Sequence, residues 1–468
     1  MLTLKIALRN IYRHTRRSLA TFSTITLGAA AVTLFGAFIT YIQYGVQTGA
    51  IQQTGHLQVF RTGYFDFGSA SPALWGIEDY QKVLQLIRTD PELQSLSAVV
   101  TPIQSVAGIV GNSENNTSKT FFGVGFVPSE RDRMKQWNEY GTGAQGLQHS
   151  GLKDDDLSGG IAGIGLVRIL GLCKPVNLDD CPTVPVTSEP QDPPPARSTS
   201  VNLKELAERD NPLGAAAQND PHPAVDLLAA TAGGAPNVVS LQIKDVDLQP
   251  AKELDDNYIG MNIGLAQNLA YGRGAHKATG IVVQLNRTED TQRARSRLLS
   301  SFKQHGLDLE VRDFTELNPQ YSQIIGLFAS IFSFISVIIG IIVVFTVSNA
   351  MSMSVVERTG EIGAMRAMGV RRKGVRRQFL VEGIMLGLIG ATCGILLAYI
   401  AAYGINHANL TWTPPGRVAP VPLILYMSGA YWLIGLTWVG LLMVSMVAAV
   451  IPAGRAGRMN VVDALRHV

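Results

Sequence analysis

The chain has 468 residues, of which 46% are hydrophobic and only 16% are charged, against about 25% charged residues in an ordinary soluble domain. Its 39 lysines and arginines and 36 aspartates and glutamates leave a formal net charge of +3. This composition excludes disordered, collagen-like and coiled-coil classes, each of which needs a polar or strictly periodic sequence.

Four stretches of the chain account for nearly all of the missing charge. Ser18–Phe60, Leu317–Val356 and Val418–Gly454 contain no Asp, Glu, Lys or Arg, and Gln378–Asn406 contains only Glu382. Each stretch holds an apolar core of the roughly 20 residues with which a helix crosses a bilayer. Four such segments disfavour buried helices of a soluble protein, so we predict transmembrane helices with cores at 19–44, 324–348, 379–405 and 430–451.

The residues before the first predicted span are basic. Lys5, Arg9, Arg13, Arg16 and Arg17 recur at helical spacing without any acid, and apolar residues fall on another face. This pattern predicts a cytoplasmic amphipathic helix lying on the inner leaflet. The apolar run that follows is longer than the ~7–15-residue core of a secretory signal, and no small-residue cleavage site follows it. We therefore interpret it as an uncleaved span.

The first charge-free stretch is longer than a bilayer requires. Its 43 residues would make one helix of roughly 64 Å, against a hydrocarbon core of about 30 Å. The surplus is polar but uncharged and includes four glutamines, and Leu317–Gln323 has the same character before the second span. We predict that both helices continue beyond the bilayer as a stalk; a loop at Gly45 and Gly49 is the alternative.

Charge is distributed unequally between the connecting segments. Residues 1–17, 357–377 and 452–468 together hold 15 basic and 3 acidic residues, whereas residues 61–316 hold 23 basic and 32 acidic ones. Because basic loops remain in the cytoplasm, this asymmetry places both termini and the 357–377 loop there. Residues 61–316 and the short loop 407–429 are then extracytoplasmic. A nucleic-acid-binding role for the basic residues is disfavoured by their place beside a span.

Residues 61–316 are long enough to form a core of their own. Strand-like runs occur at 56–60, 97–110, 119–126, 238–243, 280–285 and 307–314, and a helical run at 288–304 separates the last two. These runs predict an α+β domain with a β-α-β unit just before the second span. Residues 150–237 differ, because Gly159–Gly165 is rich in glycine and Pro182–Arg197 contains six prolines. We predict a variable subdomain with irregular connections there.

Two of the three cysteines lie in this subdomain. Cys173 and Cys181 are eight residues apart, and outside the cytoplasm they could close a small loop as a disulfide. Two unpaired thiols are the alternative. No histidine stands at metal-ligand spacing near them, which disfavours a zinc site.

The sequence carries no motif of a nucleotide-binding or hydrolytic site. It contains no G-x-x-x-x-G-K-[ST], no H-E-x-x-H and no G-x-S-x-G. Glu382 is the one acidic or basic residue well inside a predicted span. A charge in a membrane is by default a functional candidate, and an orienting or capping role is an equal alternative. We predict a non-catalytic chain with no cofactor or metal of its own.

The loop between the second and third spans carries the most informative motif. Residues 349–372 are NAMSMSVVERTGEIGAMRAMGVRR. Thr359 is a helix-capping residue type, Glu361 falls in the first turn and Gly369 follows the end, which predicts a short helix over 359–368. Three residues at i, i+3 and i+4 form one apolar and cationic face suited to a groove in a cytoplasmic partner: Ile362, Met365 and Arg366. An ordinary interfacial loop that binds lipid phosphates is the alternative.

Three segments resemble the permease family of ABC transporters that includes MacB, LolC, LolE and FtsX. They are LKIALRNIYRH near the N-terminus, NAMSMSVVERTGEIGAMRAMGVRRKGVRRQFLVEG in the loop and IPAGRAGRMNVVDALR near the C-terminus. The topology of one span, a large external domain and three further spans also matches that family. The chain has no fused ATPase and so resembles the stand-alone permease subunits.

The resemblance implies that residues 357–369 form the coupling helix that docks on a separate cytoplasmic ATPase, which binds ATP and Mg. The residues implied in coupling are Glu357, Arg358, Glu361, Ile362, Met365, Arg366 and Gly369. ATP hydrolysis would then move the external domain (mechanotransmission) to export or extract lipoprotein, lipid or other hydrophobic cargo. One alternative is an FtsX-like signalling subunit that regulates an external cell-wall hydrolase without transport. Another is a receptor or adhesion protein with no ATPase partner.

The same resemblance implies the setting and the other partners. A second permease protomer would pair with this one, as a homodimer or a heterodimer, in a bacterial inner membrane. A periplasmic adaptor or lipoprotein carrier and the membrane lipids are further expected partners, and nucleic acid is not.

The third predicted span has a face of small residues. Gly383, Gly387, Gly390 and Gly394 follow one another at spacings of 4, 3 and 4, which puts them on one side of a helix where another helix can approach closely. Contact within one subunit and a seam between two protomers are both open, and we favour the first.

The sequence therefore predicts an α-helical membrane protein with four transmembrane helices plus a large α+β extracytoplasmic domain between the first and second spans. The expected segments are an N-terminal amphipathic helix (1–17), span 1 with stalk (18–60), the external domain (61–316), stalk with span 2 (317–356), the coupling loop (357–377), span 3 (378–406), an external loop (407–429), span 4 (430–451) and a cytoplasmic tail (452–468).

Overall fold

The computed structural model describes residues 15–142, 149–173, 176, 222–249, 251–272, 276–413 and 420–459. The chain divides into two compact units. One consists of Met1–Tyr44, Ser322–Trp412 and Val421–Val468, and the other of Gly45–Tyr321 and Thr413–Pro420. The predicted amphipathic helix at 1–17 falls almost entirely outside the described residues.

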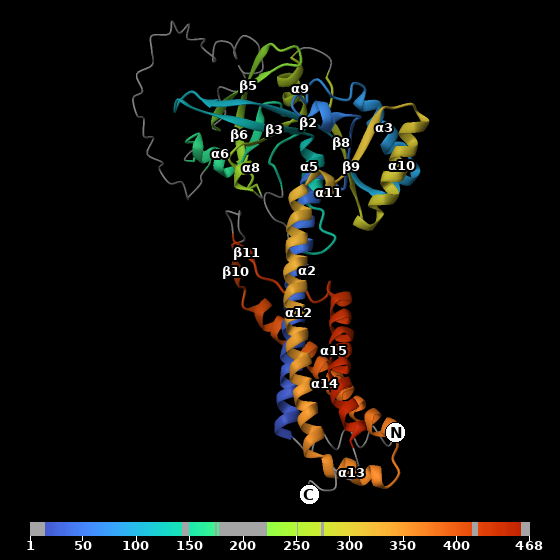
Figure 1. Ribbon diagram of the computed structural model, residues 1–468. Coiled ribbons are helices and arrows are strands. Elements are labelled where there is room, and N and C mark those ends of the chain that lie inside the picture. Colours follow the sequence, from blue (N-terminus) through green and yellow to red (C-terminus); the bar gives the residue numbers. More distant parts are fainter. Residues whose placement is uncertain are drawn as a thin grey trace. The chain divides into compact units, whose positions relative to one another are not determined.

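The first unit is helical (Figure 1). Four of its helices are long and apolar enough to cross a membrane. They are α2 (Thr15–Thr54), α12 (Pro319–Glu357), α14 (Arg372–His407) and α15 (Tyr431–Arg458). The prediction of four candidate spans is therefore confirmed. A short helix, α13 (Thr359–Ala367), follows α12, and a two-stranded ladder of β10 (Thr411–Trp412) and β11 (Val421–Pro422) lies between α14 and α15.

The charge-free surplus at both stalks is helical. α2 has 40 residues and passes through Gly45 and Gly49 without a break, and α12 has 39 residues. At 1.5 Å per residue each helix is roughly 60 Å long. The alternative of a loop at the two glycines is wrong. α15 likewise continues past Ile451 and includes Pro452, so the first seven residues of the expected cytoplasmic tail belong to this helix.

The four glycines of α14 divide between two neighbouring helices. A Cβ atom built on Gly383 would lie 2.5 Å from Ala449 Cβ, and one on Gly387 would lie 2.6 Å from Ser445 Cβ, both in α15. Atoms this close cannot coexist, so the absence of a side chain is what lets α14 and α15 approach.

The other two glycines face α2. A Cβ on Gly390 would lie 2.8 Å from Ile25, and one on Gly394 would lie 2.5 Å from the backbone oxygen of Thr26. Both pairs of contacts lie within one chain. The spacing of 4, 3 and 4 thus serves a three-helix contact, with α14 between α2 and α15.

The second unit is a mixed α/β domain, which confirms the predicted class of the region between the first two spans (Figure 1). Nine strands within the described residues form one sheet in the order β3-β7-β4-β6-β5-β2-β8-β1-β9. They are β1 (Leu57–Arg61), β2 (Ser97–Asn112), β3 (Thr117–Phe126), β4 (Gly159–Ala162), β5 (Ala224–Ala230), β6 (Pro236–Val246), β7 (Tyr258–Asn262), β8 (Gly280–Leu285) and β9 (Leu309–Asp313).

Part of this sheet closes on itself. β3 pairs with β2 as well as with β7, so β2, β3, β7, β4, β6 and β5 form a ring. The long strand β2 makes this possible, because Ser97–Ile103 pairs with β8 whereas Gln104–Asn112 pairs with β3. β8, β1 and β9 continue the sheet beyond the ring from β2.

Helices on either part give the domain two cores. One core lies in the ring with α6 (Ile164–Ile169) and α9 (Ile263–Tyr271). The other packs the β8-β1-β9 extension against α3 (Tyr80–Thr89), α4 (Pro91–Leu96) and α10 (Thr291–Gln304). The predicted β-α-β unit is present as β8, α10 and β9, but β1 lies between its two strands and runs antiparallel to both.

The expected variable subdomain at 150–237 is not separate where it is described. β4 and β5 come from its two ends, and both are strands of the ring. The proline-rich segment and Cys181 lie outside the described residues, so the disulfide with Cys173 stays a prediction. Cys393 in α14 is a free thiol.

The remaining short elements connect these parts. They are the π-helix Tyr64–Gly68, α5 (Pro128–Lys135), α8 (Lys252–Asp255), the 3-10 turn Thr288–Asp290 and α11 (Phe314–Leu317).

Candidate functional site

The loop expected to meet a partner forms a short helix with a sharp entry. α12 ends at Glu357, and Arg358, with φ −103° and ψ 18°, turns the chain before α13 begins at Thr359. We had predicted that Thr359 caps this helix, and this prediction is wrong. Thr359 is the first helical residue, and its hydroxyl donates to the carbonyl oxygen of Val356 at 2.7 Å. A threonine hydroxyl at a helix junction can bond backward as well as forward, and here the preceding turn supplies the acceptor.

The end of α13 follows the predicted glycine. Gly369 has φ +94°, a conformation that favours glycine. Its N–H donates to Arg366 O at 3.1 Å, and the N–H of Val370 donates to Met365 O at 3.1 Å. This pair of bonds is the Schellman arrangement, which satisfies the last carbonyls of a helix and fixes the direction in which the chain leaves.

The face of α13 that we expected to dock outward is turned inward instead. Ile362 is only 1% exposed and belongs to a core that includes Val355 of α12 and Phe379 of α14. Met365 packs against the same core. The apolar spacing of this helix therefore reflects packing within the chain. The outward face consists of other residues: Glu361, Ala364, Ala367 and Met368, and Met368 is 78% exposed.

A buried ion pair joins α13 to the third candidate span. Arg358 Nη1 lies 3.3 Å from Glu382 Oε2, and both side chains are less than a tenth exposed. Arg358 Nε donates to Glu361 Oε2 at 3.1 Å, and its guanidinium lies 5.4 Å from the centre of the Phe379 ring. We call Arg358, Glu361, Phe379 and Glu382 the α13 junction. Glu382 thus has an orienting role, but the residue it orients lies 24 positions earlier and could not be identified from spacing.

A second arginine of α13 has an unsatisfied donor. The Nε of Arg366 is buried and has no hydrogen-bond partner among the described residues. A buried N–H of this kind costs about 1–3 kcal/mol when it stays unpaired. A hydrogen-bond acceptor placed beside Arg366 Nε would therefore stabilise the protein.

The end of α2 is anchored in the α/β domain. Gln52 Nε2 donates to Trp137 O at 2.8 Å, and Arg131 Nη1 donates to the carbonyl oxygens of Gln52 and Gln53 at 3.3 and 2.7 Å. The last carbonyls of a helix lack partners within it, and a cation there also matches the helix dipole. We call this contact the α2 joint. The predicted stalk is helical up to Thr54, and its buried Gln52 packs into the domain.

The beginning of α12 meets the end of α2 in the same domain. Asn318 Nδ2 donates to Thr54 Oγ1 at 3.2 Å, and Phe314 N donates to His56 O at 3.0 Å. Ile51 and Phe314 share a small core with Trp137. The segment that leaves the first candidate span and the segment that enters the second are thus bonded to each other.

Comparison with known sequences identifies the helical unit. Residues 327–461 match the family described as FtsX-like permease C-terminal. We call these residues the FtsX-like permease domain, after the family that they resemble. This domain includes α13, the whole α13 junction, all of α14 and α15 and most of α12. Of the three sequence segments that suggested a permease family, the loop segment lies within this match, the C-terminal segment lies within it up to Val461, and the N-terminal segment lies outside it.

Curated relatives of the FtsX-like permease domain are transporter proteins. A macrolide export ATP-binding/permease protein MacB from Shewanella sp. (strain W3-18-1) is 34% identical over 151 residues, which cover 30% of this chain and 22% of the relative. The ABC transporter permease YtrF from Bacillus subtilis (strain 168) is 34% identical over 137 residues, covering 28% and 30%.

A third relative matches a longer segment. The probable syringafactin export ATP-binding/permease protein SyfD from Pseudomonas syringae pv. syringae (strain B728a) is 33% identical over 177 residues, or 34% of this chain and 25% of the relative. The chain thus spans less than a third of the length of these relatives.

Proposed function

We propose that the chain is the membrane subunit of an ABC transporter complex, in which a separate cytoplasmic ATPase moves the external domain through the FtsX-like permease domain. The α13 junction carries this proposal. The helix α13 is exposed on one side and is held on the other side by a buried ion pair. A helix with this arrangement can receive force from a partner and transmit it to the helices behind it. The relatives named as ATP-binding/permease proteins make an ATPase partner a natural expectation.

The exposed face of α13 is the proposed contact with the ATPase. Met368 offers a large apolar surface, and the small side chains of Ala364 and Ala367 would let a partner approach the helix closely. Because Ile362 is held in the core and Arg358 is paired with Glu382, a push on this face would move α12 and α14 together with α13. ATP and Mg would be bound by the ATPase.

The external domain is the proposed output. α12 is one uninterrupted helix from Pro319 to Glu357, and its first residues are bonded to the end of α2 through Asn318 and Thr54. A displacement that begins at α13 would therefore reach the point where both helices enter the α/β domain. We propose that this displacement exports or extracts a lipoprotein, a lipid or another hydrophobic cargo.

A bacterial inner membrane is the proposed setting, with both termini in the cytoplasm and the α/β domain in the periplasm. The candidate spans expose large apolar side chains, such as Phe334 at 67% and Phe345 at 72% in α12. Apolar surface of this extent on a folded chain needs a cover, and membrane lipid and a second permease protomer would supply it. A periplasmic adaptor or carrier would complete the complex.

Purification from the native host tests the proposal. We expect the tagged chain, extracted in mild detergent, to copurify with an ATPase detectable by mass spectrometry. Met368→Asp should lower the recovered ATPase at least tenfold, whereas Met368→Leu, which keeps the apolar surface, should change it less than twofold. Recovery without any ATPase, or equal recovery with both variants, would overturn the proposal.

A second arm separates transport from signalling. ATP-dependent release of a hydrophobic cargo from vesicles that contain the complex supports a transporter. A cell-wall hydrolase that copurifies and is activated without any cargo release supports the FtsX-like alternative instead.

A further inference from the structure

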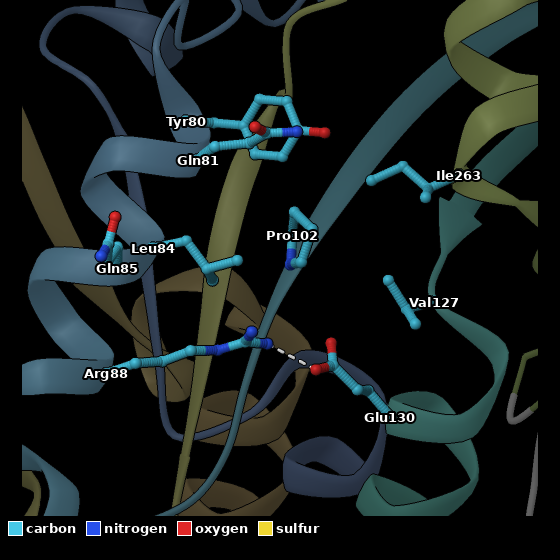
Figure 2. A pocket seen from close by; sticks show the side chains of 9 residues that line it. All are labelled: Tyr80, Gln81, Leu84, Gln85, Arg88, Pro102, Val127, Glu130 and Ile263. Carbon is cyan, nitrogen blue, oxygen red and sulfur yellow. Dashed lines mark hydrogen bonds and ion pairs between the residues drawn. The ribbon is translucent and has the colours of Figure 1, made fainter. Parts of the chain in front are cut away.

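A groove in the α/β domain lies between α3 and the start of α9. It has a volume of about 500 Å³, which falls in the range of binding sites for small molecules and peptide segments. One wall is the face of α3 that carries Tyr80 and Leu84, and the opposite wall is formed by Pro102, Val127 and Ile263. Figure 2 shows these side chains converging from α3, β2, the end of β3 and the start of α9.

Two charged residues line one end of this groove. Arg88 and Glu130 make an ion pair through Arg88 Nη2 and Glu130 Oε1 (Figure 2). Arg88 Nη2 and Nε also donate to the carbonyl oxygen of Val100, at 2.6 and 3.2 Å. The guanidinium has five N–H donors, so its Nη1 group is left for a further acceptor.

The second carboxylate oxygen of Glu130 differs from the first, which is paired with Arg88. Glu130 Oε2 is buried and makes no hydrogen bond within the described residues, and in Figure 2 the oxygen away from the ion pair is turned toward Pro102. A buried carboxylate oxygen without a donor is costly. Glu130 Oε2 therefore lacks a donor, and it lies beside a guanidinium that can still donate through Nη1.

These requirements distinguish between classes of ligand. A fatty acid or another anionic amphiphile could meet Arg88 but would leave Glu130 Oε2 unpaired and would bring a second carboxylate close to it. A cationic amphiphile could meet Glu130 Oε2 but would bring a second positive charge close to Arg88. A peptide group has one N–H and one C=O and can satisfy both, while apolar side chains fill the space between Leu84 and Ile263. The exposed amides of Gln81 and Gln85 on the rim add further donors and acceptors.

We propose that this groove binds an extended peptide segment with apolar side chains, contributed by a partner of the external domain. The amide groups of the segment meet Arg88 and Glu130, and its side chains lie against the two apolar walls. Because one wall of the groove is α3 and the opposite wall includes Ile263 of the ring helix α9, an occupied groove also fixes how α3 is held against the ring. The proposal is independent of the ATPase contact at α13.

A binding assay with the purified full chain in detergent tests it. The probe is a fluorescent heptapeptide of alternating serine and leucine, capped at both ends so that it carries no charge. We expect saturable binding to the unaltered chain and at least tenfold weaker binding to Leu84→Asp. The matched control is Leu86→Asp, because Leu86 packs against the same core from the same helix but does not line the groove. It should change binding less than twofold.

Two further experiments test whether weaker binding reflects a folding defect and whether the groove prefers a different class of ligand. Benzoylphenylalanine introduced at the exposed Gln85 should crosslink to the probe, whereas the same group at the exposed Gln94 in α4 should not. Fluorescent oleate should bind at least tenfold more weakly than the peptide. Absence of a crosslink at Gln85, equal binding by the two leucine variants, or a preference for oleate would overturn the proposal.

Discussion

Arg358 Nη1 lies 3.3 Å from Glu382 Oε2, in a place where both side chains are almost fully buried. The pair joins the residue between α12 and α13 to α14, so three helices meet at one ionic contact. A buried ion pair gains little net stability, because both charges lose their hydration, but removal of one partner leaves the other unpaired at a high cost. This relationship makes the α13 junction testable by a double-mutant cycle.

We expect Arg358→Met and Glu382→Leu, each alone, to lower the free energy of unfolding by about 3–5 kcal/mol. The double variant should recover most of that loss, since no buried charge remains. Thermal unfolding of the four proteins in the same detergent measures the cycle. Arg377→Met is the control, because Arg377 is an exposed residue of the same basic segment and should alter stability by less than about 0.5 kcal/mol. A double variant as unstable as the worse single variant would contradict the ionic role.

The sequence was most informative where the physical constraint is local. Absence of charge over about 20 residues is enough to predict a candidate span, and all four were found in the right places. Gly369 predicted the end of α13 because few other residue types adopt a positive φ at low cost. The extension of α2 through Gly45 and Gly49 was correctly expected, although the helical propensity of glycine alone would have argued against it.

Contacts between distant segments were not predictable. Ile362 was assigned to an outward face because helical spacing shows which residues share a side, but not whether the chain itself covers that side. The closed ring depends on β2 changing partner between Ile103 and Gln104, for which the alternating pattern gives no indication. Arg131 reaches the end of α2 from 78 residues away, and only the folded domain brings the two together.

The glycines of α14 lead to a second prediction. We expect Gly394→Ala to destabilise the helical unit by about 1–3 kcal/mol, because the new Cβ would lie 2.5 Å from the backbone oxygen of Thr26 and a backbone atom cannot turn aside. Gly404→Ala in the same helix meets nothing within 4 Å and should be neutral or stabilising by up to about 1 kcal/mol. Melting temperatures in detergent compare the two variants. Equal destabilisation would mean that α2 and α14 are not in close contact.

The α2 joint supports a third prediction. Arg131→Gln removes the cation that bonds the last carbonyls of α2, so the final turn should open more often. We expect amide hydrogen exchange in residues 50–54 to become about tenfold faster, equivalent to the loss of roughly 1.4 kcal/mol from a charge-assisted hydrogen bond. Arg133→Gln is the matched control, since this neighbour on α5 bonds the carbonyl of Ala98 in β2 and not α2. Unchanged exchange in Arg131→Gln would show that the helix end is held by Gln52 and the small core alone.

The histidine that follows α2 gives the domain a pH dependence. His56 is fully buried; its Nδ1 accepts the N–H of Leu285 at 3.0 Å, and its Nε2 lies 3.3 Å from Thr288 Oγ1. The ring is therefore neutral, with its proton on Nε2. Desolvation by burial lowers the pKa of His56 from 6.5 to about 3. Partial burial raises the pKa of Asp156, but hydrogen bonds from Lys244 and from the backbone and hydroxyl of Ser158 lower it further, to about 2. This carboxyl therefore titrates only at a more acidic pH than His56.

Between pH 6.5 and 3 the unfolded chain binds a proton at His56 that the folded chain excludes, so the free energy of unfolding falls as the pH falls through this interval. At pH 5 the loss relative to pH 7.5 should be about 2 kcal/mol from this residue. His56→Gln should be less stable than the unaltered chain at pH 7.5 but should lose less stability between pH 7.5 and 5. His305→Gln, which replaces an exposed histidine, should retain the pH dependence of the unaltered chain. Thermal unfolding of the full chain at the two pH values measures all three, and parallel losses in His56→Gln and the unaltered chain would show that the ring is protonated without opening the domain.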